Sequence, residues 1–179
     1  MRYFLRTLSF IALVLLITAC SSQEDKQQKR QKEISEYVDA LNINPTLLDQ
    51  KKADTLIAMY GNYVKDFPQD TMCEFYLFQM SNVYQALNKC DSALYCLDRI
   101  IKEYPDGNKV GAAYFFKGVV LKDVCLNTQE SVKAFETYIE KFPQSKHAET
   151  ARRMIMLDTM QNELKYIENS VRDDKDTVN

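Results

Sequence analysis

The chain has 179 residues, of which 46% are hydrophobic and 27% charged, and its formal net charge at pH 7 is -2. These values are ordinary for one globular domain, and they exclude the strongly basic surface on which nucleic-acid binding depends. Only 4 Gly and 4 Pro are present, and the segments between them are rich in residues that lose little entropy in a helix. We therefore expect an all-α protein.

Residues 1–19 have the layout of a secretory signal peptide. Arg2 and Arg6 precede an apolar run over residues 8–17, which is too short to remain as a membrane-spanning helix. The run leads to Ile17-Thr18-Ala19-Cys20, which resembles the lipobox of bacterial lipoproteins. The resemblance implies cleavage before Cys20 and lipidation of its thiol. The alternative is an ordinary signal or N-terminal anchor in which Cys20 has no role.

Residues 20–32 then form a polar stretch in which residues 21–32 offer no apolar side chain to bury. Such a composition predicts a flexible, solvated tether. Ser21, rather than Asp, follows the cysteine, and in the best-known lipoprotein sorting systems this favours transfer to the outer membrane. The resemblance thus implies a lipid-anchored protein of the outer membrane that faces the periplasm.

A helical-repeat domain is expected over residues 33–170. Its first helix begins at Glu33 and ends at Asn42 to Pro45, where Asn44 can cap and Pro45 can open a second helix that ends at Phe67. Two further helical pairs follow, with internal turns at residues 88–91 and 126–128.

Ser145 is expected to cap a last helix that ends near Ser170, followed by a disordered tail over residues 171–179. We expect this helix to have one packing stripe, with its other side in water. The stripe comprises Ala148, Ala151, Ile155, Met160, Leu164 and Ile167.

Three aromatic-proline pairs divide the domain: Phe67-Pro68, Tyr104-Pro105 and Phe142-Pro143. The prolines are 37 residues apart (68 to 105) and 38 residues apart (105 to 143). A period of this length is typical of stacked helical hairpins. Each pair is therefore predicted to close one hairpin.

Two of these units resemble the tetratricopeptide repeat. The central unit has the family's spacing at Leu77, Met80, Ser81, Tyr84, Ala93, Leu97, Ile100 and Pro105, and the next unit at Tyr114, Gly118, Leu121, Ser131, Phe135, Tyr138 and Pro143. The resemblance implies a TPR-like α-solenoid of about three helical hairpins with a C-terminal capping helix. The repeat is longer than the usual 34 residues, and Tyr138 stands where a small residue is usual.

The sequence around Pro105 and Pro143 also resembles the repeats of BamD-like outer-membrane lipoproteins and of periplasmic Tol-Pal-associated proteins. Residues 104–107 leading to 112–118, and residues 142–151, carry this likeness. It implies an adaptor that binds envelope proteins or peptide segments, in outer-membrane protein assembly or envelope maintenance. The alternative is a structural or peptidoglycan-linked spacer lipoprotein without a peptide groove.

In tetratricopeptide proteins the first helix of each hairpin lines a binding groove. The resemblance places Phe75, Phe78, Asn82, Gln85, Ala112, Phe115, Val119 and Lys122 in it. An apolar, aromatic groove suits a helix or an extended peptide. The competing interpretation is that some of these aromatic residues only pack against the neighbouring hairpin.

Four cysteines remain besides Cys20. Cys90 and Cys125 lie near the internal turns of adjacent units, so they are the best candidate disulfide. We nevertheless expect half-buried thiols without a disulfide to be the favoured state. Neither a CxxC motif nor a Cys/His spacing typical of metal sites is present.

Nothing in the sequence predicts catalysis. His147 is the only histidine and is expected to be structural or solvent-facing. There is no Gly-rich phosphate loop or serine in an elbow context. We therefore expect a protein-binding module that is not an enzyme, without a cofactor or a small-molecule substrate.

Overall fold

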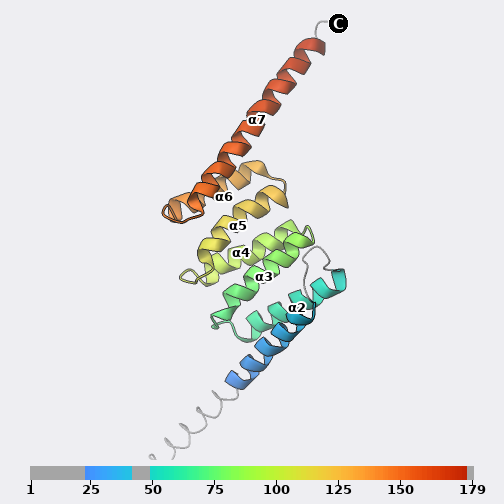
Figure 1. The fold of residues 1–179 in the computed structure, drawn as a ribbon, viewed down its shortest axis with the longest axis vertical. Coiled ribbons are helices and arrows are strands. Elements are labelled where there is room, and N and C mark those ends of the chain that lie inside the picture. Colours follow the sequence, from blue (N-terminus) through green and yellow to red (C-terminus); the bar gives the residue numbers. More distant parts are fainter. Residues whose placement is uncertain (1–22, 42–48, 177–179) are drawn as a thin grey trace, which may run out of the picture. The chain divides into compact units, whose positions relative to one another are not determined.

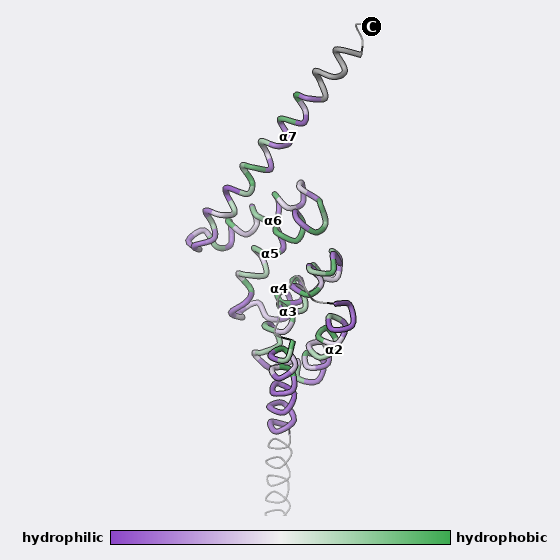
Figure 2. The backbone as a smooth tube through the Cα atoms, turned by 45° about the vertical axis from the view of Figure 1, so that its right-hand side comes forward, coloured by the Kyte–Doolittle hydropathy of each residue, from purple (hydrophilic) through white to green (hydrophobic). Residues whose placement is uncertain are grey.

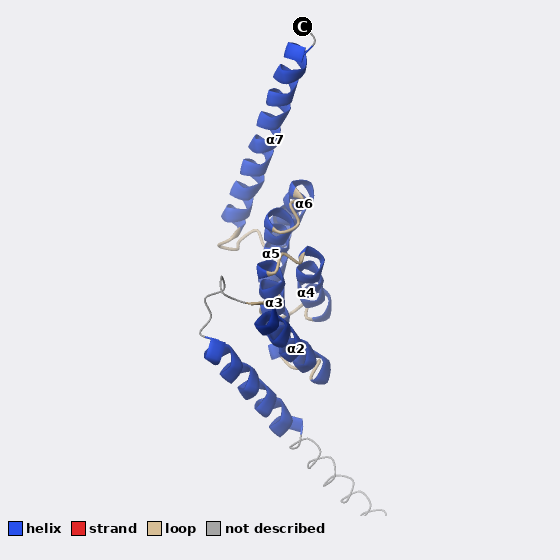
Figure 3. Ribbon diagram, turned by 90° about the vertical axis from the view of Figure 1, so that its right-hand side faces the viewer, coloured by secondary structure: helices blue, strands red, loops and turns tan. Residues whose placement is uncertain are grey.

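A computed structural model describes residues 23–41 and 49–176, with side chains given as far as residue 168. Within these ranges every regular element is a helix (Figure 3). After an N-terminal helix over residues 23–41, the elements are α2 (Gln50–Asp66), α3 (Met72–Ala86), α4 (Cys90–Glu103), α5 (Val110–Asp123), α6 (Thr128–Lys141) and α7 (Ala148–Asp176). They follow one another as helical hairpins (Figure 1). The signal peptide, Cys20, Asn44 and Pro45 lie outside the described residues.

The chain divides into two compact units, residues 1–73 and 74–179. In the first unit, the expected tether is wrong from residue 23 onward, because residues 23–41 are helical. Gln, Glu, Lys and Arg are good helix formers, and Gln31 donates a hydrogen bond of 2.6 Å to the Tyr63 hydroxyl. Gln27 also donates to Asp70. The polar stretch therefore packs through amides instead of apolar side chains.

The three aromatic-proline pairs close their helices in the same way. Phe67, Tyr104 and Phe142 are the C-caps of α2, α4 and α6, with φ near -130° and ψ near 55°. Each donates its backbone N–H to the carbonyl four residues earlier. The following proline cannot continue the helix. The prediction that the pairs are hairpin closures is confirmed.

Two positions recur in each closure: the residue four places before the aromatic cap and the residue two places after the proline. Tyr63 donates its hydroxyl to Asp70 at 2.5 Å, and the hydroxyls of Tyr138 and Ser145 are 2.6 Å apart. The middle closure has Ile100 at the first position, and Gly107 at the second. The polar pair therefore occurs in the two closures that have a tyrosine.

Small residues allow the helices of each hairpin in the second unit to approach closely. Ser81 on α3 donates to the carbonyl of Ala93 on α4 at 3.1 Å. In the next hairpin, Ser131 on α6 donates to the carbonyl of Gly118 on α5 at 2.9 Å. The serine thus lies on the first helix of one hairpin and on the second helix of the other, but in both hairpins its hydroxyl links the two helices.

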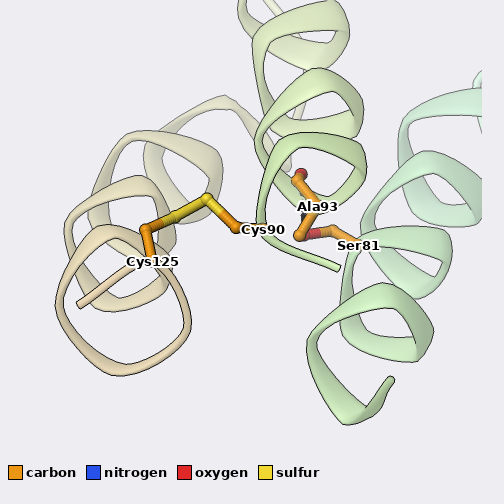
Figure 4. The surroundings of a disulfide bond; sticks show 4 residues. All are labelled: Ser81, Cys90, Ala93 and Cys125. Carbon is orange, nitrogen blue, oxygen red and sulfur yellow. Dashed lines mark hydrogen bonds between the residues drawn. A yellow bond between two sulfur atoms is a disulfide. The ribbon is translucent and has the colours of Figure 1, made fainter. Parts of the chain in front are cut away.

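The internal turns of these hairpins also correspond. Asn88 and Leu126 both have φ of 54°, in the left-handed region. Cys90 and Cys125 lie beside these turns and are joined by a disulfide bond with a Cα–Cα distance of 5.2 Å (Figure 4). The candidate pair is thus bonded, and our preference for thiols without a disulfide is wrong for these two cysteines. Both internal turns lie at the same end of their hairpins, which brings the sulfurs together.

The last helix differs from expectation in length and in packing. It extends to Asp176, so the predicted disordered tail is wrong for residues 171–176. Ala148 and Ala151 are buried, and Ile155 packs against Phe135 and Tyr138 of α6. Met160, Leu164 and Ile167, which we expected in the same stripe, are 50%, 59% and 55% exposed.

Candidate functional site

The predicted groove residues lie on α3 and α5, the first helices of the two hairpins in the second unit. The Phe78 ring on α3 meets the Phe116 ring on α5 edge to face, with centroids 5.1 Å apart. Such ring pairs stabilise packing beyond the area that they bury. The contact brings the two helices together along a surface of half-buried aromatic side chains.

Lys109, directly before α5, completes this surface. Its ammonium lies 5.6 Å from the centroid of the Phe75 ring and 5.8 Å from that of the Phe78 ring, which is within the range of cation–π attraction. Both rings are half-buried. We call Phe75, Phe78, Lys109 and Phe116 the aromatic face.

The polar residues predicted beside it continue along α3. Asn82 donates to the side-chain oxygen of Gln79 at 3.0 Å, and Gln85 donates to the Ser81 hydroxyl at 3.4 Å. Both side chains are half-buried. Their remaining hydrogen-bonding capacity suits the polar backbone of a bound segment.

Three predicted groove residues on α5 instead hold the second unit together. Phe115 packs against Phe135 and Tyr138, with centroids 5.6 Å and 5.3 Å away, and Val119 contacts the same cluster. Lys122 forms an ion pair with the buried Asp158 on α7. Phe115 and Val119 therefore pack within their own hairpin and against α7 rather than lining a free groove. The competing interpretation, packing against the neighbouring hairpin, describes the contact between Phe78 and Phe116.

The sequence prediction missed Lys109 and Phe116. Phe116 is adjacent to Phe115, so a small error in the rotation assigned to α5 exchanges their roles. Lys109 precedes the helix and has no assigned position in the repeat. The cation of the aromatic face thus comes from the loop before α5.

A concavity lies within the first unit, between the helix over residues 23–41 and α2. Its volume is about 670 Å³. Its lining includes Arg30, Glu33, Ile34, Asp54 and Met59. The helix over residues 23–41 therefore forms one wall of a groove that mixes charged and apolar side chains, with Arg30 contributed by the expected tether.

Other chemistry is sparse in the described part of the chain. No group of three or more His, Cys, Asp or Glu side chains there could hold a metal ion. Cys96 is buried, and burial raises the pKa of its thiol to about 11. His147 is exposed, and the centroid of its ring lies 5.4 Å from that of the Phe115 ring.

Among the described helices none combines the length and hydropathy needed to cross a membrane.

Part of the chain matches a known family. Residues 76–107 match the model of the tetratricopeptide repeat, which covers most of α3, all of α4 and the start of the following loop. None of the curated proteins shows a significant match to the chain. The matched segment carries the buried Leu77, Ala93 and Leu97 of the predicted pattern. The match and the repeated hairpins confirm the predicted all-α, TPR-like fold class and support a tetratricopeptide-repeat protein.

Proposed function

We propose that this protein is a lipid-anchored adaptor of the bacterial cell envelope, and that it binds an envelope protein or peptide through the aromatic face. Tetratricopeptide repeats support protein-protein interaction. The observation that carries the site is the position of Phe75 and Phe78, half-buried under the ammonium of Lys109. Aromatic rings beside a cation suit a partner segment with apolar anchors and an acidic group.

The membrane attachment rests on the sequence before residue 21. A lipidated Cys20 with several acyl chains would hold the protein stably at a membrane surface. The disulfide between Cys90 and Cys125 supports an oxidising compartment outside the cytoplasm. Labelling with a radioactive fatty acid tests the anchor: the wild-type protein takes up label and sediments with membranes, whereas Cys20→Ser does neither.

The partner is sought by crosslinking in intact cells, followed by affinity purification and mass spectrometry. Phe75→Ser with Phe78→Ser should remove a stoichiometric partner while the circular dichroism spectrum remains unchanged. Tyr95→Ser is the matched control, because Tyr95 is 64% exposed on α4, outside the aromatic face. Equal recovery from all variants would exclude the aromatic face as the binding site.

The spacer alternative predicts a different result. A spacer without a dedicated groove yields no saturable protein partner, and the Phe75/Phe78 variant then behaves like wild type. We also propose that the protein has no catalytic activity and needs no cofactor.

A further inference from the structure

A second cavity adjoins the concavity between the helix over residues 23–41 and α2. Its volume is about 630 Å³, and it is lined by the first turns of that helix and by Asp66 and Phe67 at the end of α2. Arg30 and Glu33 line both cavities. The two cavities are therefore neighbouring parts of one groove, which lies within the first unit.

One end of this groove carries an excess of positive charge. Its lining has Lys26, Lys29 and Arg30, which we call the cationic end, against the carboxylates of Glu33 and Asp66. Arg30 pairs with Asp66 at 3.8 Å, whereas neither lysine belongs to an ion pair among the described residues. Figure 2 shows these first turns, next to the grey trace, in the purple of hydrophilic residues. The two ammonium groups favour an anion.

The other end of the groove has an apolar floor, formed by Ile34, Ala58 and Met59, which we call the apolar end. Ile34 is 4% exposed, and Met59 is half-buried. The charged side chains around this floor, two cations and two carboxylates, balance one another. The volume of this cavity, about 670 Å³, is typical of a site for a small molecule that buries apolar surface.

The groove has the length of a single acyl chain. Asp66 lines one end and Gln50 the other, and they are sixteen residues apart on α2 (50 to 66), or about 24 Å. An extended chain of about sixteen carbons, with C–C bonds of about 1.5 Å, is roughly 20 Å long. A cationic end that continues into an apolar end therefore matches one anionic head group with one hydrocarbon chain.

We propose that this groove binds a single-chain anionic lipid, a fatty acid or a lysophospholipid, with its head at the cationic end and its chain along the apolar end. The proposal rests neither on the aromatic face nor on lipidation of Cys20. An uncharged lipid of the same chain length leaves the lysines of the cationic end without a counter-charge. Free phosphate leaves the apolar end empty, so both bind more weakly than the anionic lipid.

Photocrosslinking to the full-length protein in phosphatidylcholine nanodiscs tests the site. Hexadecanoate with a diazirine near the end of its chain should label Ile34, Ala58 or Met59, as located by mass spectrometry. Hexadecanol with the same diazirine should label them roughly fivefold less, because it has no charge for the lysines to bind. Equal labelling by the acid and the alcohol, or labelling mainly of the exposed Met160 and Leu164, would show adsorption to any apolar surface and contradict the proposal.

Competition identifies the head group. Hexadecanoate and lysophosphatidylglycerol, both without a diazirine, should reduce the labelling, and the stronger competitor shows whether the head is a carboxylate or a phosphodiester. Inorganic phosphate at the same concentration should not compete. Competition by phosphate, or by neither lipid, would overturn the proposal.

Two pairs of substitutions locate the head of the lipid. Lys26→Gln with Lys29→Gln should reduce labelling by hexadecanoate about fivefold, with helicity preserved because Gln is a good helix former. Lys32→Gln with Lys65→Gln is the matched control, since it removes the same charge from exposed positions that line neither cavity. The control should label like wild type. Equal loss of labelling in the two double variants would assign the effect to overall charge and rule out the cationic end.

Discussion

The buried carboxylate of Glu74, in the first turn of α3, accepts a hydrogen bond of 2.7 Å from the backbone N–H of Lys109 at the start of α5. A second bond of 2.9 Å comes from the N–H of Asn108. Helix N-termini leave such donors without intrahelical partners and favour negative charge. One side chain thus links the beginnings of the two helices that carry the aromatic face.

Replacing Glu74 with Gln should lower the free energy of unfolding by about 1–3 kcal/mol, because one backbone donor then meets an amide NH₂ in a buried site. Glu136→Gln, an exposed position on α6, is the control and should change it little. Urea denaturation measures both. Gly107→Ala should resemble Glu74→Gln, since an added Cβ would collide with the Glu74 carboxylate.

Two glycines in α5 should respond oppositely to alanine. A Cβ on Gly118 would lie 2.7 Å from the fully buried Phe135 ring, so Gly118→Ala should destabilise by about 1–3 kcal/mol. On Gly111 the nearest Phe142 atom would be at 3.6 Å, an ordinary contact. Gly111→Ala should therefore stabilise by about 0.5–1 kcal/mol. Thermal melting measures both variants, and a lower melting temperature for both would mean that α5 tolerates no added methyl group.

The disulfide closes a loop with a sequence separation of 35 residues. By the chain-entropy model its loss should destabilise the protein by about 3–4 kcal/mol. Denaturation of the Cys90→Ser, Cys125→Ser double variant, compared with the oxidised wild type, measures this effect. Alkylation without reductant should label neither cysteine, and labelling of both in the folded, unreduced protein would show that the bond is absent.

Alkaline pH should destabilise the fold through Cys96. Burial raises the pKa of this thiol from 9.0 to about 11, so the folded protein holds the proton longer than the unfolded chain. The stabilisation is complete below pH 9 and is lost as the pH rises through 11. Burial also raises the pKa of Tyr60, with the same sign. Cys96→Ala should therefore reduce the decline in unfolding free energy between pH 9 and pH 11, by about 1.4 kcal/mol for each unit of pKa shift that the substitution removes. An identical decline in the variant would assign the effect to Tyr60 alone.

Leu126 is strained in its turn, since it has φ of 54° and is 82% exposed. Asn tolerates this conformation better than Leu does. Leu126→Asn should stabilise by about 1 kcal/mol, whereas Asn88→Leu, the reverse change in the equivalent turn, should destabilise by a similar amount. Denaturant midpoints of the two variants test the pair, and shifts in the same direction would show that backbone strain is not the cause.

Local rules were sufficient for most of the fold. Proline after an aromatic residue ended α2, α4 and α6 where predicted, because proline cannot continue a helix and this holds in any environment. The apolar spacing of Leu77, Ala93 and Leu97 marked the core of the central hairpin for the same reason, since a helix has a constant period.

Other features of the fold depend on contacts between residues far apart in the chain, and only the tertiary structure decided them. The rotation of α5 turned Phe115 into the core and left Phe116 against Phe78, and a rotation of this size cannot be read from adjacent residues of equal hydrophobicity. The loop before α5 brought Lys109 over the α3 rings. The sequence by itself determined where α2, α4 and α6 end and which period the helices follow, because those depend on neighbouring residues. The proximity of Cys90 to Cys125 and the buried and exposed faces of α7 emerged only once the hairpins had packed, because packing fixes which side of each helix remains in water.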